Sequence, residues 1–293
     1  MTESEFLAER FEQNRDRLRA VAYRMLGSLA EADDAVQEAW LRLNRSDADS
    51  IENLGGWLTT VVGHVCLDML RARNSRREDS FDEQLPSPPA RKKTSANPEQ
   101  EAVLADSVGL ALMVVLDRLA PAERLAFVMH DMFDLSFDEI ASIVGRTPTA
   151  ARQLASRARR RIRGGPAPAA SVPQQRKVVD AFLAALRGRD FEALVAVLDP
   201  DVVIHSDQAS TLPGRPAEVR GAEDWARQAI TAAQGARAAR IALINGTVGL
   251  IVAPRGRLFR VLRFTFANGK ISRLDVVGDP AELASLDLAV LDK

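Results

Sequence analysis

The spacing of apolar residues predicts that the chain begins with a succession of helices. Six of them recur at helical spacing before Gly27: Leu7, Phe11, Leu18, Val21, Ala22 and Met25. Ser28 and Glu31 then have the spacing of a capping box, which predicts a second helix that runs to about Leu43. A third helix is expected over residues 56–73.

Two stretches interrupt this helical pattern. Residues 79–99 contain four prolines among polar and charged residues, and residues 164–168 consist of glycine, proline and alanine. Between them, short helical pieces are expected from Glu101 to Arg163. We therefore predict two all-α domains, residues 1–78 and 101–165, with a linker over 79–100 and a tether over 166–173.

From residue 174 the pattern predicts a different fold class. Two short helices, over 174–187 and 190–198, are followed by strand-like runs at 202–204, 239–244, 248–252, 258–266 and 271–277. Asn245-Gly246 and Asn268-Gly269 are strong signals for two-residue hairpin turns. Residues 174–293 are therefore predicted to form an α+β domain, with a curved antiparallel sheet and helices behind it.

A helix-turn-helix is the sharpest local prediction. Ser136 and Glu139 have the spacing of a second capping box, and Gly145 supplies a helix stop. Thr147 can cap the next helix, and Pro148 suits its first position. Two helices separated by so short a turn can place the second helix in the major groove of DNA.

The second helix of this pair has two different faces. One face is apolar: Ala151, Leu154, Ala155, Ala158 and Ile162. The other is polar: Thr149, Arg152, Gln153, Ser156 and Arg160, flanked by Arg157. Arginine and glutamine can form paired hydrogen bonds with base edges, and further arginines neutralise phosphates. We predict DNA binding over a merely solvated face, because the caps, the turn length and the charged face agree.

The helix that starts at Ser28 has a polar face of another kind. Its buried stripe is predicted to be Ala32, Ala35, Val36, Ala39 and Leu43. The opposite face carries Asp34, Gln37, Glu38 and Leu41, with Trp40 at the border. An acidic face with an exposed leucine favours a protein partner, since DNA would repel it. A solvated face with a tucked Trp40 is the alternative.

The helix over 56–73 ends in a basic cluster that suits phosphate contacts: Arg71, Arg73, Arg76 and Arg77. Gly63 and His64 are expected to interrupt this helix, as in a loop that binds an unpaired base. For His64, a surface or structural role is the alternative. Cys66 is expected to be a small core residue.

The composition of the chain shows that its charge is unevenly distributed, and it indicates a cellular compartment. The net charge is −1, but residues 146–163 hold seven arginines and no acid, whereas residues 31–38 hold four acids and no base. The single cysteine excludes an intrachain disulfide and a Cys-rich zinc site. No apolar run reaches membrane-spanning length, and the charged N-terminus is unlike a signal peptide. We expect a cytoplasmic protein with no membrane contact.

Together these segments resemble the extracytoplasmic-function sigma factors, subunits of bacterial RNA polymerase. Residues 1–78 resemble their domain two: Asp33 to Trp40 resembles the polymerase-clamp-binding helix, and Gly56 to Arg73 the segment that opens and reads the minus-ten element. Leu119 to Ile162 resembles domain four, the minus-thirty-five reader, in its Leu119 to Arg124 and Arg152 to Arg159 motifs.

The resemblance implies a monomer when free, with promoter DNA and core RNA polymerase, at the clamp region of its largest subunit, as partners. It implies no cofactor, no metal and no enzymatic chemistry.

Residues 174–293 resemble the SnoaL-like extension of one subgroup of these factors. The resemblance rests on Val179 to Leu198, Asp199 to Val203, and Val276 to Leu283. Two subgroup motifs are altered here, at Gln84 to Pro88 and at Asp207 to Thr211. In that subgroup the extension replaces a separate anti-sigma protein, so the resemblance implies that it regulates the front of the chain.

Two other functions remain as alternatives. SnoaL-like folds include polyketide cyclases and resemble ketosteroid isomerases, and His205, Asp207 and Asp275 are the candidates for a base and an acid. The same three residues are the candidates for a regulatory pocket that holds a small-molecule ligand. A one-component regulator with a helix-turn-helix and a ligand-sensing domain would leave the acidic helix and the 56–73 helix without a role.

Overall fold

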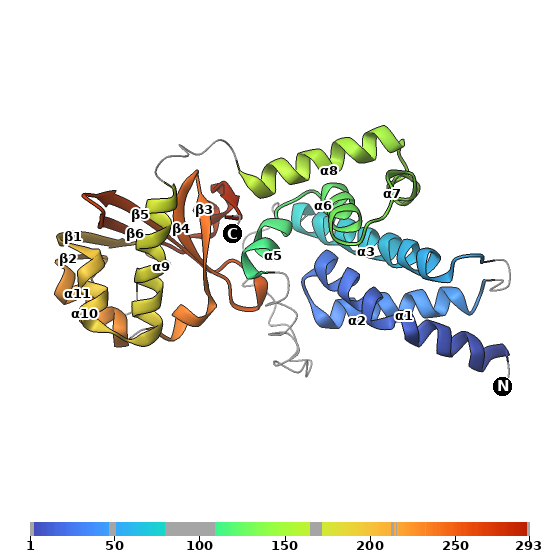
Figure 1. Cartoon of the computed structure of the whole chain (residues 1–293), viewed down its shortest axis with the longest axis horizontal. Helices are drawn as coiled ribbons and strands as arrows, with labels where there is room; N and C mark the ends of the chain where they lie inside the picture. The colour runs from blue at the N-terminus through green and yellow to red at the C-terminus, as the bar shows by residue number, and fades with distance from the viewer. Residues whose placement is uncertain are drawn as a thin grey trace. The chain divides into compact units, whose positions relative to one another are not determined.

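The computed structural model describes residues 3–46, 51–79, 109–164, 172–211, 214, 216–231 and 233–291. The chain divides into two compact units: Met1–Ser107 with Leu116–Arg159, and Val108–Val115 with Arg160–Lys293. Within the described residues, the first unit is helical and the second contains the sheet (Figure 1). Beyond residue 79, the predicted linker lies outside the described residues, and so do the helical piece from Glu101 to residue 108 and the tether up to residue 171.

The first three helices of the first unit are α1 (Glu3–Leu26), α2 (Leu29–Leu43) and α3 (Leu54–Asp79). They pack against one another through buried apolar side chains such as Leu18, Leu43 and Leu67. Helix α1 ends where predicted, because Gly27 adopts the left-handed backbone (φ 73°) that glycine accepts without strain. Ser28 then caps α2 by accepting a hydrogen bond from the backbone N–H of Glu31.

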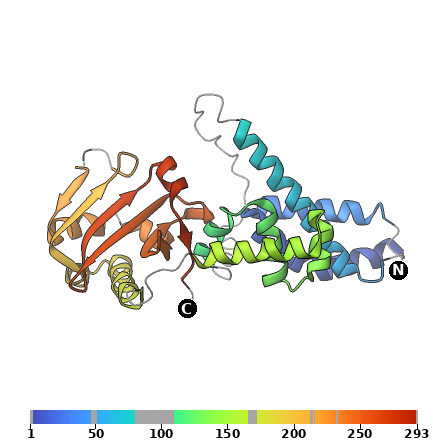
Figure 2. The ribbon, with the colours of Figure 1, turned by 90° about the horizontal axis from the view of Figure 1, so that it is seen from above.

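The predicted interruption at Gly63 and His64 is wrong. Helix α3 is continuous through both residues (Figures 1 and 2). Gly63 is instead a point of close packing, since a Cβ there would lie 2.8 Å from Cε of Met129 and 3.2 Å from Cδ1 of Ile143. The glycine therefore lets α3 approach the segment around residues 129–143, and this tertiary contact offsets its poor helix propensity.

The next helices along the chain are α5 (Leu110–Leu116), α6 (Pro121–Phe127), α7 (Phe137–Val144) and α8 (Pro148–Arg163). Most of α5 and the last residues of α8 belong to the second unit. A short π-helical turn, η2 (Val128–Met132), continues directly from α6. Sequence periodicity does not predict a π turn, because it changes the spacing over a few residues only.

The second unit contains α9 (Val172–Gly188), α10 (Phe191–Val197), α11 (Ala222–Thr231), α12 (Pro280–Ser285) and the 3-10 turns η3 (Ala233–Ala238) and η4 (Pro254–Gly256). Its strands are β1 (Leu198–Ser206), β2 (Glu218–Arg220), β3 (Ala239–Ile244), β4 (Thr247–Val252), β5 (Arg260–Ala267), β6 (Lys270–Val277) and β7 (Leu288–Ala289). They form one sheet in the order β2-β1-β6-β5-β4-β3-β7. Helix α9 packs on β3 and β4, and α11 packs on β1 (Figure 1).

The prediction of an antiparallel sheet needs one correction. Both predicted hairpins form, with positive φ at Asn245, Gly246, Asn268 and Gly269, and they set the antiparallel order of β3 to β6. Strand β1, however, pairs with β6 in parallel. Such pairing needs a long connection between the two strands, and β2, α11 and β3 to β5 provide it. The sheet is therefore mixed.

Candidate nucleic-acid interface

Local hydrogen bonds build the helix-turn-helix as predicted. The Ser136 side chain accepts from the backbone N–H of Glu139 (3.3 Å), and the Glu139 carboxylate accepts from the backbone N–H of Ser136 (2.8 Å), so the capping box is complete. Gly145 ends α7 in the left-handed conformation (φ 68°). The Thr147 hydroxyl then accepts from the backbone N–H of Ala150 (3.2 Å) at the start of α8. Residues 145–147 alone thus separate the two helices.

Helix α8 has the two faces that its sequence predicts. The apolar set is buried: Ala151, Leu154, Ala155, Ala158 and Ile162. The polar set is exposed: Thr149, Arg152, Gln153, Ser156, Arg157 and Arg160. The geometry is that of a helix with an apolar anchor and an exposed basic face, while the DNA contacts of individual side chains stay predictions.

Neighbouring side chains hold some of these arginines in place. The Arg152 guanidinium lies over the Phe137 ring, 5.0 Å from its centre, an arrangement that favours a cation. Arg157 pairs with the buried Glu123 carboxylate at 3.1 Å, and Arg159 pairs with Asp131 at 2.6 Å. Arg157 and Arg159 therefore pair with acids of neighbouring segments, whereas Arg152 and Arg160 are exposed and pair with no carboxylate among the described residues.

The predicted polymerase-binding face of α2 is only partly exposed. Asp34, Gln37 and Leu41 are exposed, and Leu41 is one of the few large apolar side chains that is exposed among the described residues. Glu38 is half-buried and accepts a hydrogen bond from Arg42 at 3.0 Å. These residues form an acidic patch around an apolar side chain, as a protein-binding face requires.

Trp40 lies at the edge of this α2 face. Its ring is half-buried and packs against Phe11 of α1, with ring centres 4.9 Å apart. A groove of about 230 Å³ between α1 and α2 is lined by these two aromatic residues together with Val36 and Gln37. The contact with Phe11 agrees with the alternative of a tucked tryptophan, and a contact of Trp40 with polymerase stays a prediction.

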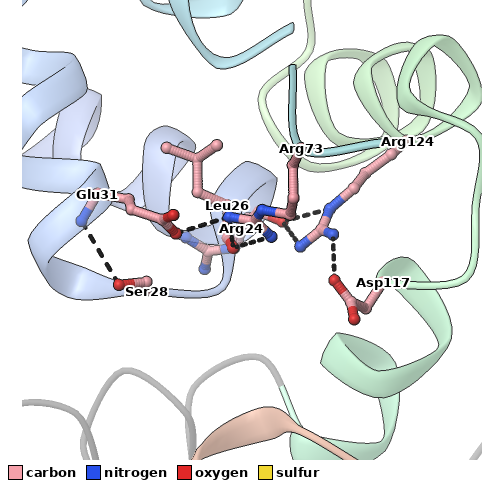
Figure 3. Close-up of polar contacts among 7 residues, drawn as sticks. All are labelled: Arg24, Leu26, Ser28, Glu31, Arg73, Asp117 and Arg124. Atoms are coloured by element: carbon pink, nitrogen blue, oxygen red, sulfur yellow. Dashed lines mark hydrogen bonds and ion pairs between the residues drawn. The ribbon is translucent and has the colours of Figure 1, made fainter. Parts of the chain in front are cut away.

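The basic cluster at the end of α3 is not one exposed patch. Arg71 and Arg76 are exposed, whereas Arg73 turns inward and pairs with Glu31 at 2.6 Å (Figure 3). Arg73 also donates to the carbonyl oxygen of Leu26. The side chain of Arg77 lies outside the described residues. His64 is half-buried on α3. Contact between Arg73 and a phosphate would therefore compete with an internal ion pair.

A buried arginine joins the two sigma-like parts of the first unit. Arg124 of α6 is 2% exposed, and its guanidinium donates to the carbonyl oxygen of Arg24 (3.0 and 3.1 Å) and to Asp117 (3.2 Å) (Figure 3). Burial lowers the pKa of Arg124, and Asp117 acts in the opposite direction.

The arginines of Figure 3 donate to backbone carbonyl oxygens at the end of a helix. The last carbonyls of a helix lack intrahelical partners and carry the negative end of the helix dipole. Arg73 and Arg124 supply donors to the carbonyls of Leu26 and Arg24 at the end of α1. Sequence reasoning assigned Arg73 to DNA and Arg124 only to a family motif. No local signal shows that an arginine will meet a carbonyl about a hundred positions away, as Arg124 does.

The structure does not bring His205, Asp207 and Asp275 together in a pocket. His205 and Asp275 are register partners on β1 and β6, but His205 is exposed and Asp275 binds Arg273 at 2.9 Å. Asp207 follows β1 and accepts from the backbone N–H groups of Gly278 and Asp279, both at 2.7 Å, and of Ser210. Burial alone would raise the pKa of Asp207, but these hydrogen bonds lower it. Asp207 is an ionised anchor for a loop, which removes the geometric basis for an acid–base pair.

The described residues contain neither a candidate metal site nor a membrane-spanning helix. No group of three or more histidine, cysteine, aspartate or glutamate side chains there could hold a metal ion. Among the helices that the structure describes, none is long and apolar enough to cross a membrane. Cys66 is buried, as expected, and burial raises the pKa of its thiol to about 12.

Comparison with known proteins identifies both helical parts. Residues 10–76 match the family described as Sigma-70 region 2, and residues 109–162 match Sigma-70, region 4. The chain is 36% identical over 286 residues to the ECF RNA polymerase sigma factor SigJ of Mycobacterium tuberculosis, covering 92% of this chain and 91% of the relative. It is 33% identical over 271 residues to a probable ECF RNA polymerase sigma factor, SigI, of the same species, covering 91% of each.

A solved structure resembles the chain over most of its length. The crystal structure of the M. tuberculosis extracytoplasmic function sigma factor SigJ is 34% identical, with a TM-score of 0.44, covering 94% of this chain and 98% of that one. The sequence matches decide the family. The chain belongs to the ECF RNA polymerase sigma factors, which bind core RNA polymerase and promoter DNA and direct promoter-specific initiation of transcription.

Proposed function

We propose that α2 of this sigma factor binds core RNA polymerase and that α8 binds promoter DNA. The observation that carries the proposal is the contrast between two exposed helix faces: one acidic around Leu41, the other basic around Arg152. The α2 face, with Asp34, Gln37 and Leu41 at its centre, would bind the clamp region of the largest polymerase subunit. The α8 face would read the minus-thirty-five element.

The test of the α2 face is pull-down of purified core RNA polymerase by the full chain carrying D34R and L41R. We expect loss of core binding with unchanged helical circular dichroism, because two positive charges would face a surface that complements an acidic one. The matched control is D180R with A184R on the exposed side of α9, which makes the same changes of charge. Undiminished pull-down by the α2 variant would contradict the proposal.

The basic end of α3 is proposed to contact the promoter near the minus-ten element. Arg71 and Arg76 are exposed there and can neutralise phosphates. His64 and Arg77 belong to the same proposed contact. Arg73 would join it only if its pair with Glu31 opens, so its contribution to DNA binding is proposed to be smaller than that of Arg71.

We further propose that residues 174–293 regulate the factor and carry out no catalysis of their own. Support comes from inside the second unit, where the backbone N–H of Val290 donates to the carbonyl oxygen of Ile162 at 2.8 Å, in the last turn of α8. A second support is Arg124 of region four, whose guanidinium donates to the carbonyl oxygen of Arg24 in region two. If regions two and four exchange between a closed and an open arrangement, the extension can shift this equilibrium only by binding the two arrangements with different affinity.

Transcription in vitro with purified core polymerase tests the regulatory proposal. We compare the full chain with a chain that ends at residue 165, on the same promoter, and check the helicity of both. The truncation should change transcript yield strongly, in either direction, while the same promoter is still recognised. Equal output of the two proteins under all conditions would refute regulation. Because sigma factors act on RNA polymerase, which is cytoplasmic, we place this function in the cytoplasm.

A further inference from the structure

The second unit contains a cavity of about 430 Å³ between its sheet and its helices. The residues Ser206, Leu250, Leu262 and Val276 line it from four strands, and the strand register places them in one row across the sheet. Helices α9 and α11 cover this row with Leu183, Leu186, Trp225 and Ala229. Cavities of this size commonly hold small molecules.

Strand alternation explains why this cavity differs from the predicted pocket. Ile204 and Ser206 face the cavity, so His205 between them faces the other side of the sheet. Val276 likewise faces the cavity, and Asp275 lines a separate hollow on the opposite side. The cavity and two of the three predicted residues, His205 and Asp275, thus belong to opposite faces of one sheet.

Among the residues that the structure describes, the lining of the cavity is apolar apart from a few side chains, and none of these is acidic. Arg260 of β5 is the basic residue in the lining, and its guanidinium lies 4.9 Å from the ring centre of Phe259. No carboxylate among the described residues pairs with Arg260. Its Nε is buried and has no hydrogen-bond partner there. An arginine in an apolar wall without an acidic partner favours an anionic ligand.

Two more observations mark the same place. Ser210, which is 5% exposed, also lines the cavity. Phe259, in the lining beside Arg260, is 54% exposed, which is unusual for so large an apolar side chain. Buried polar groups are normally paired, so the buried Nε of Arg260, which has no hydrogen-bond partner among the described residues, indicates a missing acceptor.

We propose that this cavity binds an apolar organic acid. The hydrocarbon body fills the space between Leu250, Leu262 and Trp225, and the carboxylate pairs with the guanidinium of Arg260. Phe259 covers the apolar body next to the charged group. This binding requires only the second unit, so it does not depend on the proposed contacts with polymerase or promoter.

The test is isothermal titration calorimetry of the full chain with decanoate and with decanol, below their aggregation concentrations. The two probes share a hydrocarbon chain and differ in the charged group. We expect decanoate to bind about tenfold more tightly than decanol, as a charge-assisted hydrogen bond in an apolar site gives. R260Q should bind the two probes equally, since the amide keeps a planar donor but loses the charge.

Two further variants separate this site from general effects. R257Q removes the same charge from an exposed position nearby and should leave the tenfold preference unchanged. A229F narrows the cavity from α11 and should weaken both probes, with folding checked by circular dichroism. Equal binding of the two probes to the unmodified chain, equal losses in R257Q and R260Q, or no binding of either probe would overturn the proposal. Promoter-directed transcription is measured separately, so failure of the cavity proposal leaves the test of the sigma function intact.

Discussion

The exposed face of α8 and the arginine cluster at the end of α1 use the same side chain for opposite purposes. On α8, Arg152 and Arg160 point outward, where phosphates and base edges can reach them. At the end of α1, Arg73 and Arg124 turn inward to backbone carbonyls and carboxylates of their own chain. A guanidinium serves either purpose, because its five donors fit any cluster of oxygens. The difference teaches that a run of basic residues locates charge but does not say whether the charge is used inside or outside the protein.

The strongest test of this contrast is R124Q. The variant leaves the Arg24 carbonyl and Asp117 without their charged donor, and it does so in a buried site. We expect a loss of about 2–3 kcal/mol in the free energy of unfolding, the usual cost of removing a buried donor to charged and backbone oxygens. Urea unfolding of the full chain, followed by far-UV circular dichroism, measures it.

The control for R124Q is R160Q, which makes the same change on an exposed position. Its loss of stability should stay within about 0.5 kcal/mol, because exposed substitutions away from special features have small effects. If the two variants were equally stable, Arg124 would not be a structural link, and the contrast between inward and outward arginines would fail.

The second test concerns base reading by Arg152. Replacement with alanine should weaken holoenzyme binding by about 1–3 kcal/mol at one promoter position, and it should have little effect once that base pair is already altered. Gln153→Ala should act in the same way at a neighbouring position. Electrophoretic mobility shift on a set of single-base promoter variants measures this pattern. Equal losses on every promoter variant would show a phosphate contact instead.

The sequence predicts the local parts of this molecule well. Ser136, Glu139, Gly145 and Pro148 define the helix-turn-helix, because each acts through backbone groups only a few residues away. The Asn-Gly turns define two hairpins for the same reason. Short elements such as β2 and β7 gave no periodic signal, and the parallel pairing of β1 with β6 depends on residues far apart in the sequence.

The candidate site likewise combines features that nearby residues determine with features that depend on residues far apart in the sequence. The faces of α8 follow from helical period, so the outward arginines there could be chosen from the sequence alone. The inward turn of Arg73 depends on Glu31, and the burial of Arg124 depends on the end of α1. The cavity lined by Ser210 and Arg260 needs the register of four strands, which no local pattern fixes.

The third test concerns Arg160, which is exposed and lies among the arginines at the end of α8. A phosphate contact carries no base information, so R160A should weaken binding to all promoter variants alike. The slope of log K against log salt should fall in magnitude by about one, because one fewer counterion is released. Salt titrations of holoenzyme binding for R160A and R152A, side by side, measure this difference. A base-dependent loss for R160A would move it into the same class as Arg152.

The smallest expected effect extends the contrast from arginine to aspartate. Asp207 turns inward to three backbone N–H groups, whereas Asp34 is exposed on α2. In D207N an amide NH₂ would face some of these donors, so the variant should lose about 1 kcal/mol of folding stability at pH 7, and D34N should lose almost none.

The pKa of Asp207 is lowered in the folded chain, so the ionised group stabilises folding above its unfolded pKa of about 3.9. That contribution disappears as the pH falls through the lower folded pKa. The difference in melting temperature between the unmodified chain and D207N should therefore be full at pH 7 and shrink below about pH 4. Thermal melts of the unmodified chain, D207N and D34N across this range measure the effect, and a difference that grows toward low pH would show that Asp207 is not held as an anion.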